Sequence, residues 1–144
     1  MHVEYAFLAD AASAGPDGKF NVLGGGVEQI LARDFPVVVP TLALVGKLAL
    51  LPSECDVEHH LQMEIRDRDG ELIAPRLSAA FSAQRSAPAP IRQISVQFTL
   101  AVHGLQFRQP GAHTFQTDVD GQHLSTVTVH VEEVGPAACA AAGP

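Results

Sequence analysis

The chain is poor in aromatic residues and in positive charge, and each scarcity argues against a class of function. It has no tryptophan, and aromatic residues fill 6% of its 144 positions, too few to favour a stacking platform for bases or sugars. Nine Lys and Arg residues against sixteen Asp and Glu residues give a net charge of −7. Because nucleic-acid binding requires a basic surface, we expect no nucleic-acid partner.

Cysteine is also scarce, with Cys55 and Cys139 as the two examples. Two cysteines do not make a disulfide framework, so we expect free thiols in a reducing compartment. No basic segment opens the chain, and Glu4 and Asp10 interrupt its first apolar residues, so we expect no signal peptide. These features predict a cytoplasmic protein.

Long apolar runs are missing as well. The longest, residues 37–51, contains Pro40 and Lys47 and is too short to cross a bilayer, so we expect no membrane association. Apolar residues nevertheless make up 47% of the chain and charged residues 17%, as in globular proteins. We expect one domain over residues 1–134, followed by a disordered Ala/Gly/Pro-rich tail over residues 135–144.

Three Asp-Gly pairs, at positions 17–18, 69–70 and 120–121, lie between segments in which apolar and polar residues alternate. An Asp-Gly pair in that setting is a strong short-range signal for a β-hairpin. The three pairs therefore predict three hairpin tips and an all-β domain.

The middle tip allows its register to be predicted. Asp67 and Gly70 occupy the first and fourth positions of a type I turn, which predicts a three-residue loop with a bulge and pairs Asp67 with Glu71. A two-residue loop would turn the apolar set of one strand outward. Continuing the pairing places Ile65 opposite Ile73, Leu61 opposite Leu77, and Val57 opposite Phe81.

The same turn is expected at the other two tips. At the first tip it places Ala14 opposite Phe20 and Ala12 opposite Val22. At the last tip, pairing Asp118 with Gln122 places Phe115 opposite Ser125 and His113 opposite Val127.

Alternation predicts strands over most of the chain. Residues 27–34 fit either a helix or a strand, with a strand favoured, and Phe35-Pro36 and Pro40 bracket an extended edge or connection. The triple glycine at 24–26 indicates a bulge or a close backbone approach. Residues 83–90 and 103–111 are expected to be loops. The expected strands cover residues 2–9, 19–24, 41–51, 57–67, 71–82, 91–102, 112–118 and 122–133.

About eight strands with one apolar face each predict an antiparallel two-sheet β-sandwich, with Greek-key or jelly-roll wiring. Residues 41–51 differ from the others because they are apolar on both faces. Such a strand is either central to the fold or buried in a subunit contact. At an edge it would require a partner.

Several stretches, taken in order, resemble a known family. They are Tyr5-Ala6-Phe7-Leu8-Ala9-Asp10, residues 17–25, Phe35-Pro36, Asp67-Arg68-Asp69-Gly70, and Pro110-Gly111 through Asp120-Gly121. Their order and spacing resemble a bacterial and phage-associated family of small β-sandwich proteins of unknown function, over the chain to about residue 133. The chain departs from that pattern at His113, where an aromatic such as Tyr is expected. The resemblance implies the fold and a cytoplasmic context, but no catalytic residues.

Seven histidines raise the question of a metal site. His59 and His60 are adjacent in a predicted strand and therefore point to opposite faces. His103, His113 and His123 could approach one another around the last hairpin, but no spacing matches a zinc site. We expect surface histidines, with His59 or His113 partly buried and hydrogen-bonded.

Other motifs are also incomplete. The paired acids at 67/69 and 118/120 lack the further ligands of a calcium loop. The triple glycine matches no phosphate-binding motif, and neither cysteine lies in a recognisable nucleophile motif. We therefore assign no catalytic, cofactor-binding or metal-binding residue, and we expect no cofactor.

The sequence favours a non-catalytic binding or assembly module that acts through contacts with a protein partner or by self-association. One alternative is a small-molecule-binding protein or an enzyme with a site near the 103–113 loop, formed by His103, Arg108 and His113. The other alternative is a structural component of a phage or virion.

Overall fold

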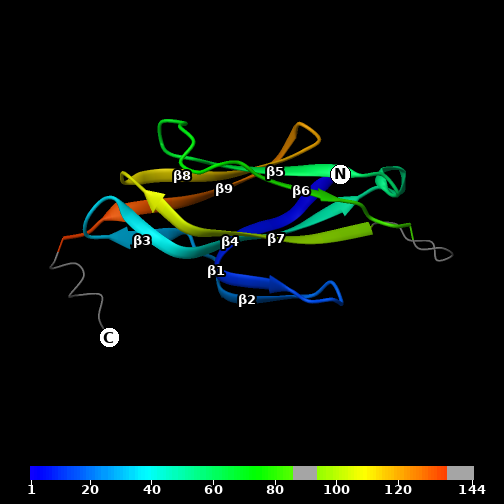
Figure 1. Cartoon of the computed structure of the whole chain (residues 1–144), viewed down its shortest axis with the longest axis horizontal. Coiled ribbons are helices and arrows are strands. Elements are labelled where there is room, and N and C mark those ends of the chain that lie inside the picture. The colour runs from blue at the N-terminus through cyan, green and yellow to red at the C-terminus, as the bar shows by residue number, and fades with distance from the viewer. Residues whose placement is uncertain (86–93, 136–144) are drawn as a thin grey trace.

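Most of the strands form where apolar and polar residues alternate, and the strands stack as two sheets. The computed structural model describes residues 1–85 and 94–135. Sheet A has the strand order β2-β1-β4-β7 and sheet B the order β3-β9-β8-β5-β6, which appear as two layers in Figure 1. The predicted β-sandwich is confirmed. The strands are β1 (His2–Ala14), β2 (Phe20–Gly25), β3 (Gln29–Ala32), β4 (Val37–Leu50), β5 (His59–Arg66), β6 (Leu77–Phe81), β7 (Ile94–Phe107), β8 (Gly111–Val119) and β9 (Gln122–Glu133).

One pair of strands departs from the antiparallel prediction, because β3 pairs with β9 in parallel. The strand alternative for residues 27–34 is confirmed by β3, and a short 3-10 helix (Pro52–Glu54) follows β4. Across the described residues, no helix is long and apolar enough to cross a membrane. The tail from residue 136 and most of the 83–90 connection lie outside the described residues, as does Cys139, whereas Cys55 is a buried free thiol.

The core lies between the sheets and follows from the alternation of side chains along each strand. In β5 the residues Leu61, Met63 and Ile65 are buried, and they alternate with Gln62 and Glu64. Residues of β1, β4, β7, β8 and β9 complete the core. It includes Leu42, Leu44, Leu48, Leu50, Phe107, Phe115, Val129 and Val131.

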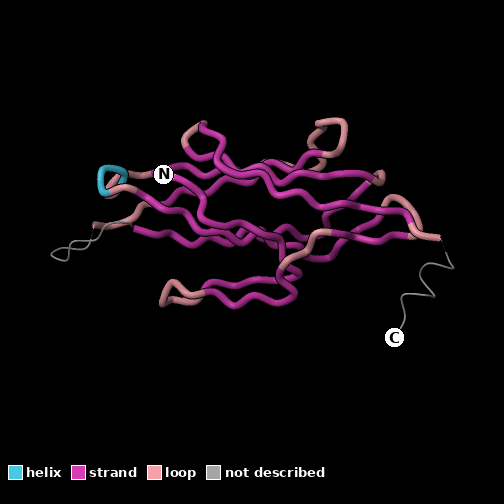
Figure 2. Tube along the Cα trace, turned by 180° about the vertical axis from the view of Figure 1, so that it is seen from behind, coloured by secondary structure: helices cyan, strands magenta, loops and turns pink. Residues whose placement is uncertain are grey.

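Strand β4 is central in sheet A, between β1 and β7. Its inward residues join the core, and its outward residues Ala43, Val45 and Ala49 are also buried, at most 2% exposed. On that side of sheet A lies a hairpin made by the end of β1 and by β2, seen as a third, smaller strip in Figures 1 and 2. The apolar character of both faces therefore reflects a central position within this chain.

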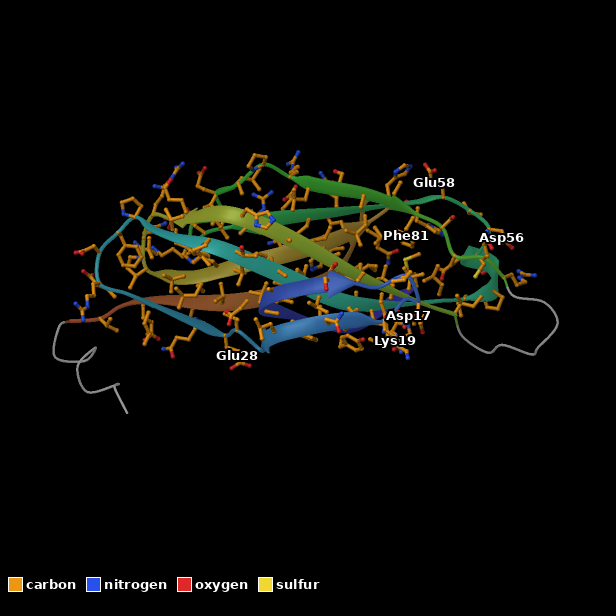
Figure 3. All side chains as sticks on the ribbon, turned by 60° about the horizontal axis from the view of Figure 1, so that its bottom comes forward. Asp17, Lys19, Glu28, Asp56, Glu58 and Phe81 are labelled. Atoms are coloured by element: carbon orange, nitrogen blue, oxygen red, sulfur yellow. The ribbon has the colours of Figure 1, made fainter. Side chains whose placement is uncertain are left out.

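This outer hairpin, residues 10–24, forms because β1 changes partner. β1 pairs with β4 as far as Ala9, and beyond Ala9 it pairs with β2 alone. The first predicted register is confirmed, with Ala14 opposite Phe20 and Ala12 opposite Val22. Figure 3 shows Asp17 and Lys19 at the tip of the hairpin.

The triple glycine makes the predicted close approach at the base of the outer hairpin. A Cβ atom on Gly24 would lie 2.1 Å from Oδ2 of Asp10, and the φ of Gly24 is +62°. The N–H groups of Gly26 and Val27 both donate to the carbonyl of Leu8. A side chain at position 24 would therefore displace Asp10.

Pro40 lies inside β4, so of the two predicted alternatives, an extended edge or a connection, the structure gives the edge. Residues 37–42 of β4 extend past the last pair with β1 and keep only β7 as a neighbour. A proline, which has no N–H, is tolerated along such a free margin. Gly104, with a φ of +66°, lies opposite Pro40 in β7.

The predicted loop over 103–111 is confirmed for residues 108–110 only, which lie between β7 and β8. β7 continues through Gly104 to Phe107, and both Leu105 and Phe107 are buried. Gly104 and Pro40 each favour a loop when taken alone, yet they face each other inside one ladder.

The predicted middle turn is confirmed, but the predicted register beyond it is wrong by two residues. Gly70 has a φ of +82°, and the N–H of Ile73 donates to the carbonyl of Ile65 at 3.0 Å. Beyond this point Leu77 pairs with Met63, Phe81 with His59, and Leu61 with Ala79. The ladder is interrupted between Ile73 and Leu77, where Pro75 has no N–H, and Val57 lies outside β5 and is 53% exposed.

The last tip is a two-residue loop, which corrects the three-residue prediction. Asp120 and Gly121 have φ values of +51° and +82°, as in a type I′ turn. Val119 pairs with Gln122, and a bulge follows between Thr117 and Asp118. The apolar face is as predicted, but the pairs are shifted by two, with Phe115 opposite Val127 and His113 opposite Val129.

Candidate functional site

The three histidines singled out from the sequence do not meet. His103 lies exposed on β7, with its Nδ1 atom 3.3 Å from Oγ1 of Thr41. His123 lies at the β8–β9 tip, 2.9 Å from the Asp118 carboxylate. His113 is buried in the core. Among the described residues, no group of three or more His, Cys, Asp or Glu side chains could hold a metal ion.

The buried His113 is a packing residue. Its ring meets the ring of Phe107 edge-on at a centroid distance of 4.9 Å. Its Nδ1 atom donates to the carbonyl of Gly111 at 3.0 Å, whereas its Nε2 atom is buried without a hydrogen-bond partner. Where the resemblance led us to expect an aromatic residue, the chain thus has an imidazole that packs edge-on against Phe107.

The loop before β8 is attached to the middle hairpin tip. The side-chain amide of Gln109 donates to the carboxylates of Asp67 and Asp69, at 3.2 and 3.0 Å. Arg108 is exposed beside it, and the buried ring of His113 lies inside the sandwich. His103, Arg108 and His113 therefore do not line one cleft.

A second histidine cluster joins three segments that are far apart in the sequence. His59, only 8% exposed, donates from Nδ1 to the Asp120 carboxylate at 2.6 Å and from Nε2 to the Glu54 carbonyl at 2.7 Å. Asp120 also accepts from the backbone N–H of His60 at 2.9 Å. Because both ring nitrogens face acceptors, both carry protons, and His59 is an imidazolium.

The electrostatics of this cluster agree with that protonation. The hydrogen bond to Asp120 raises the pKa of His59, and the bond to the Glu54 carbonyl acts in the same direction. The hydrogen bond from His59 also lowers the pKa of Asp120. Neither ring nitrogen has a free lone pair with which to act as a base, so the cluster is a link between segments. The sequence indicated that His59 or His113 would be partly buried and hydrogen-bonded, but it did not reveal the partner of His59 61 positions away.

The edge strands of the two sheets are a second candidate feature. The last strand at any margin exposes unpaired N–H and C=O groups, which proteins usually protect by shortness, charge or proline. Three of the four terminal strands are short, since β2 has 6 residues, β3 has 4 and β6 has 5. The fourth, β7, has 14 residues, and no described strand lies beyond it.

The β7 edge lacks the usual protection. From Ile94 to Phe107 the strand contains no Asp, Glu, Lys, Arg or Pro. Its outward residues Ser95, Gln97, Ala101 and His103 are exposed and uncharged, and its inward residues Val96, Phe98, Leu100 and Val102 are only half-buried. On the facing sheet, Leu77 and Phe81 of β6 pack into the same two core clusters. The β7 edge is therefore a long, neutral and partly apolar rim.

The fold and this rim define a small two-sheet β-sandwich whose candidate functional feature is an unprotected edge. The chain belongs to DUF6941, a family of unknown function, which matches residues 4–132. No curated protein matches the chain. A β-glucosidase from Listeria innocua, solved in complex with gluconolactone, is similar at 16% identity with a TM-score of 0.41. That similarity covers 92% of this chain and 17% of the β-glucosidase chain, and a likeness of this extent does not bear on function.

Proposed function

We propose that this protein is a non-catalytic binding or assembly module that makes protein–protein contacts along the β7 edge. The observation that carries the proposal is the 14-residue length of an edge strand without charge or proline. Such an edge is a template onto which another strand can add. Backbone hydrogen bonds would supply affinity, and the half-buried apolar row would supply specificity.

Two observations make a catalytic site a weaker proposal. The residues of the alternative site, His103, Arg108 and His113, lie apart, and both nitrogens of His59 are used in hydrogen bonds within the chain. A structural role in a larger particle remains compatible with an edge that adds strands. A cytoplasmic location and a bacterial or phage origin stay predictions.

Site-specific photo-crosslinking tests the proposal. A photo-reactive amino acid placed at Gln97, on the exposed face of β7, would be irradiated in an extract of the native host. We expect discrete protein adducts, of whatever partner, that the same group at Thr128 on β9 does not give. Thr128 is a stringent control, since it is also an exposed strand residue and lies where β9 pairs with β8 alone, so it tests whether contacts are specific to the β7 edge. Equal labelling at both positions, or none at either, would contradict the proposal.

A further inference from the structure

The β7 edge also indicates what its partner is. We propose that the partner is a second copy of this chain, paired antiparallel through β7 across a two-fold axis at Thr99, so that the two A sheets form one continuous sheet. This inference rests on the proposed function and specifies its partner.

Charge is the first argument for a second copy. The chain carries a net charge of −7, so two copies repel each other over most of their surfaces. The β7 edge is a stretch of 14 residues without an Asp, Glu, Lys or Arg side chain. Two copies can meet there without burying an ion, which would be costly.

The sequence of β7 is self-complementary about Thr99. In antiparallel pairing, residues equally spaced on either side of the axis face each other. The half-buried row then places Val96 opposite Val102 and Phe98 opposite Leu100. The exposed row places Gln97 opposite Ala101 and Ser95 opposite His103, and Thr99 faces its own copy. No like charges are opposed, and apolar residues meet apolar residues.

The β7 edge also offers enough area for a stable contact between two copies. With the axis at Thr99, residues 94–104 of the two copies face one another. At about 3.4 Å per residue the shared edge is about 37 Å long, and two sheets about 10 Å apart give it a height of about 15–20 Å. The resulting strip of roughly 550–750 Å² per copy reaches the lower part of the range of about 600–1,000 Å² per partner that stable specific interfaces bury. A short peptide would cover only part of an edge of this length.

Two variants of the full chain test the pairing. In a Cys139→Ser background, Thr99→Cys would place two thiols on the axis, where facing Cα atoms lie about 4.5–5.5 Å apart, within the range of a disulfide. We expect a covalent dimer on mild oxidation of Thr99→Cys and none for Thr128→Cys. Ala101→Lys brings a charge to the neutral rim of each copy. In sedimentation velocity it should weaken dimerisation at least about tenfold, while Thr128→Lys changes it by less than about twofold.

The outcomes separate this inference from the proposed function. A monomer up to 200 μM, with no disulfide at Thr99→Cys, overturns pairing between copies, and crosslinks from Gln97 to a different protein would still support binding at the edge. A dimer whose formation neither variant changes would show that two copies do not associate through β7. A dimer with the disulfide and with the Ala101→Lys effect supports both, and circular dichroism of each variant checks that it is folded.

Discussion

At the scale of single residues, the most consequential side chain is His59. It is an almost fully buried cation whose two ring nitrogens attach β5 to the short helix before it and to the β8–β9 turn. Hydrogen bonds to charged groups contribute about 1.5–3 kcal/mol each. Asp120 accepts two of the bonds in this cluster, and it does so from a left-handed conformation, which Asp tolerates better than most residues.

The protonation of His59 predicts how stability depends on pH. Because the pKa of His59 is raised by folding, its contribution is fully present below its unfolded pKa of about 6.5 and is lost as pH rises through the folded pKa. The pKa of Asp120 is lowered, so its contribution is present above about 3.9 and is lost as pH falls through its folded pKa.

Urea unfolding followed by circular dichroism between pH 5 and 9 measures this effect. We expect the wild-type free energy of unfolding to fall above pH 6.5, and His59→Gln to be about 2 kcal/mol less stable at pH 6 with a flatter dependence at alkaline pH. His60→Gln, which replaces an exposed neighbour, is the control and should keep the wild-type dependence. Identical curves for all three proteins would show that His59 is not the cation described.

The sequence predicted which single residues are buried better than it predicted their hydrogen-bond partners. The sequence predicted that His59 or His113 would be partly buried and hydrogen-bonded, and the structure buries both. The partner of His59 could not be found in this way, because Asp120 also has a sufficient local explanation as a turn residue. The orphaned Nε2 atom of His113 likewise depends on which side chains surround it in three dimensions.

At the scale of elements, turn chemistry determined where strands reverse, and local irregularities determined which residues pair. The first two tips have the predicted three-residue loops. The third has an Asp-Gly pair of the same kind but forms a two-residue loop, and a bulge beside it, in which Leu124 of β9 has no partner in β8, shifts the register by one further residue. Together the loop and the bulge shift the register by two, as the interruption at Pro75 does, without changing the face. The apolar faces were therefore predictable and the exact pairs were not.

The centre of β4 gives a prediction at this scale. A Cβ atom on Gly46 would lie 2.3 Å from Cζ of Phe98, which faces it from β7. Overpacking of this kind usually destabilises by about 1–3 kcal/mol. We expect Gly46→Ala to lower the free energy of unfolding by about 2 kcal/mol and Phe98→Leu to recover part of that loss in the double variant.

A double-mutant cycle of unfolding free energies in urea tests whether residues 46 and 98 interact, since a coupling energy between them is expected only if they are in contact. Gly135→Ala serves as the control for a glycine with open space, as no atom lies within 4 Å of a Cβ added there and its φ is outside the left-handed region. Additive effects of Gly46→Ala and Phe98→Leu would contradict the facing arrangement of β4 and β7.

At the scale of the whole molecule, alternation and turn signals were enough to predict a two-layer sandwich. They could not predict the strand order, because pairing between distant strands leaves no local signal. The parallel neighbours β3 and β9 and the outer hairpin both depend on such pairing. The position of β4 could be narrowed to two alternatives, and the structure gives the central one. The unprotected margin belongs to β7, a strand that the sequence pattern presents as ordinary.

The central claim is that the β7 edge carries the protein's contacts, and backbone amide hydrogen exchange tests it most directly. Exchange of residues 94–107 would be measured at 1 μM and at 200 μM protein. Alternate amides of β7 point away from β4, and we expect these to become protected at the higher concentration while those of β2 and β6 do not change. Amides along the free side of β7 that exchange at the same rate at both concentrations and in host extract would contradict the claim.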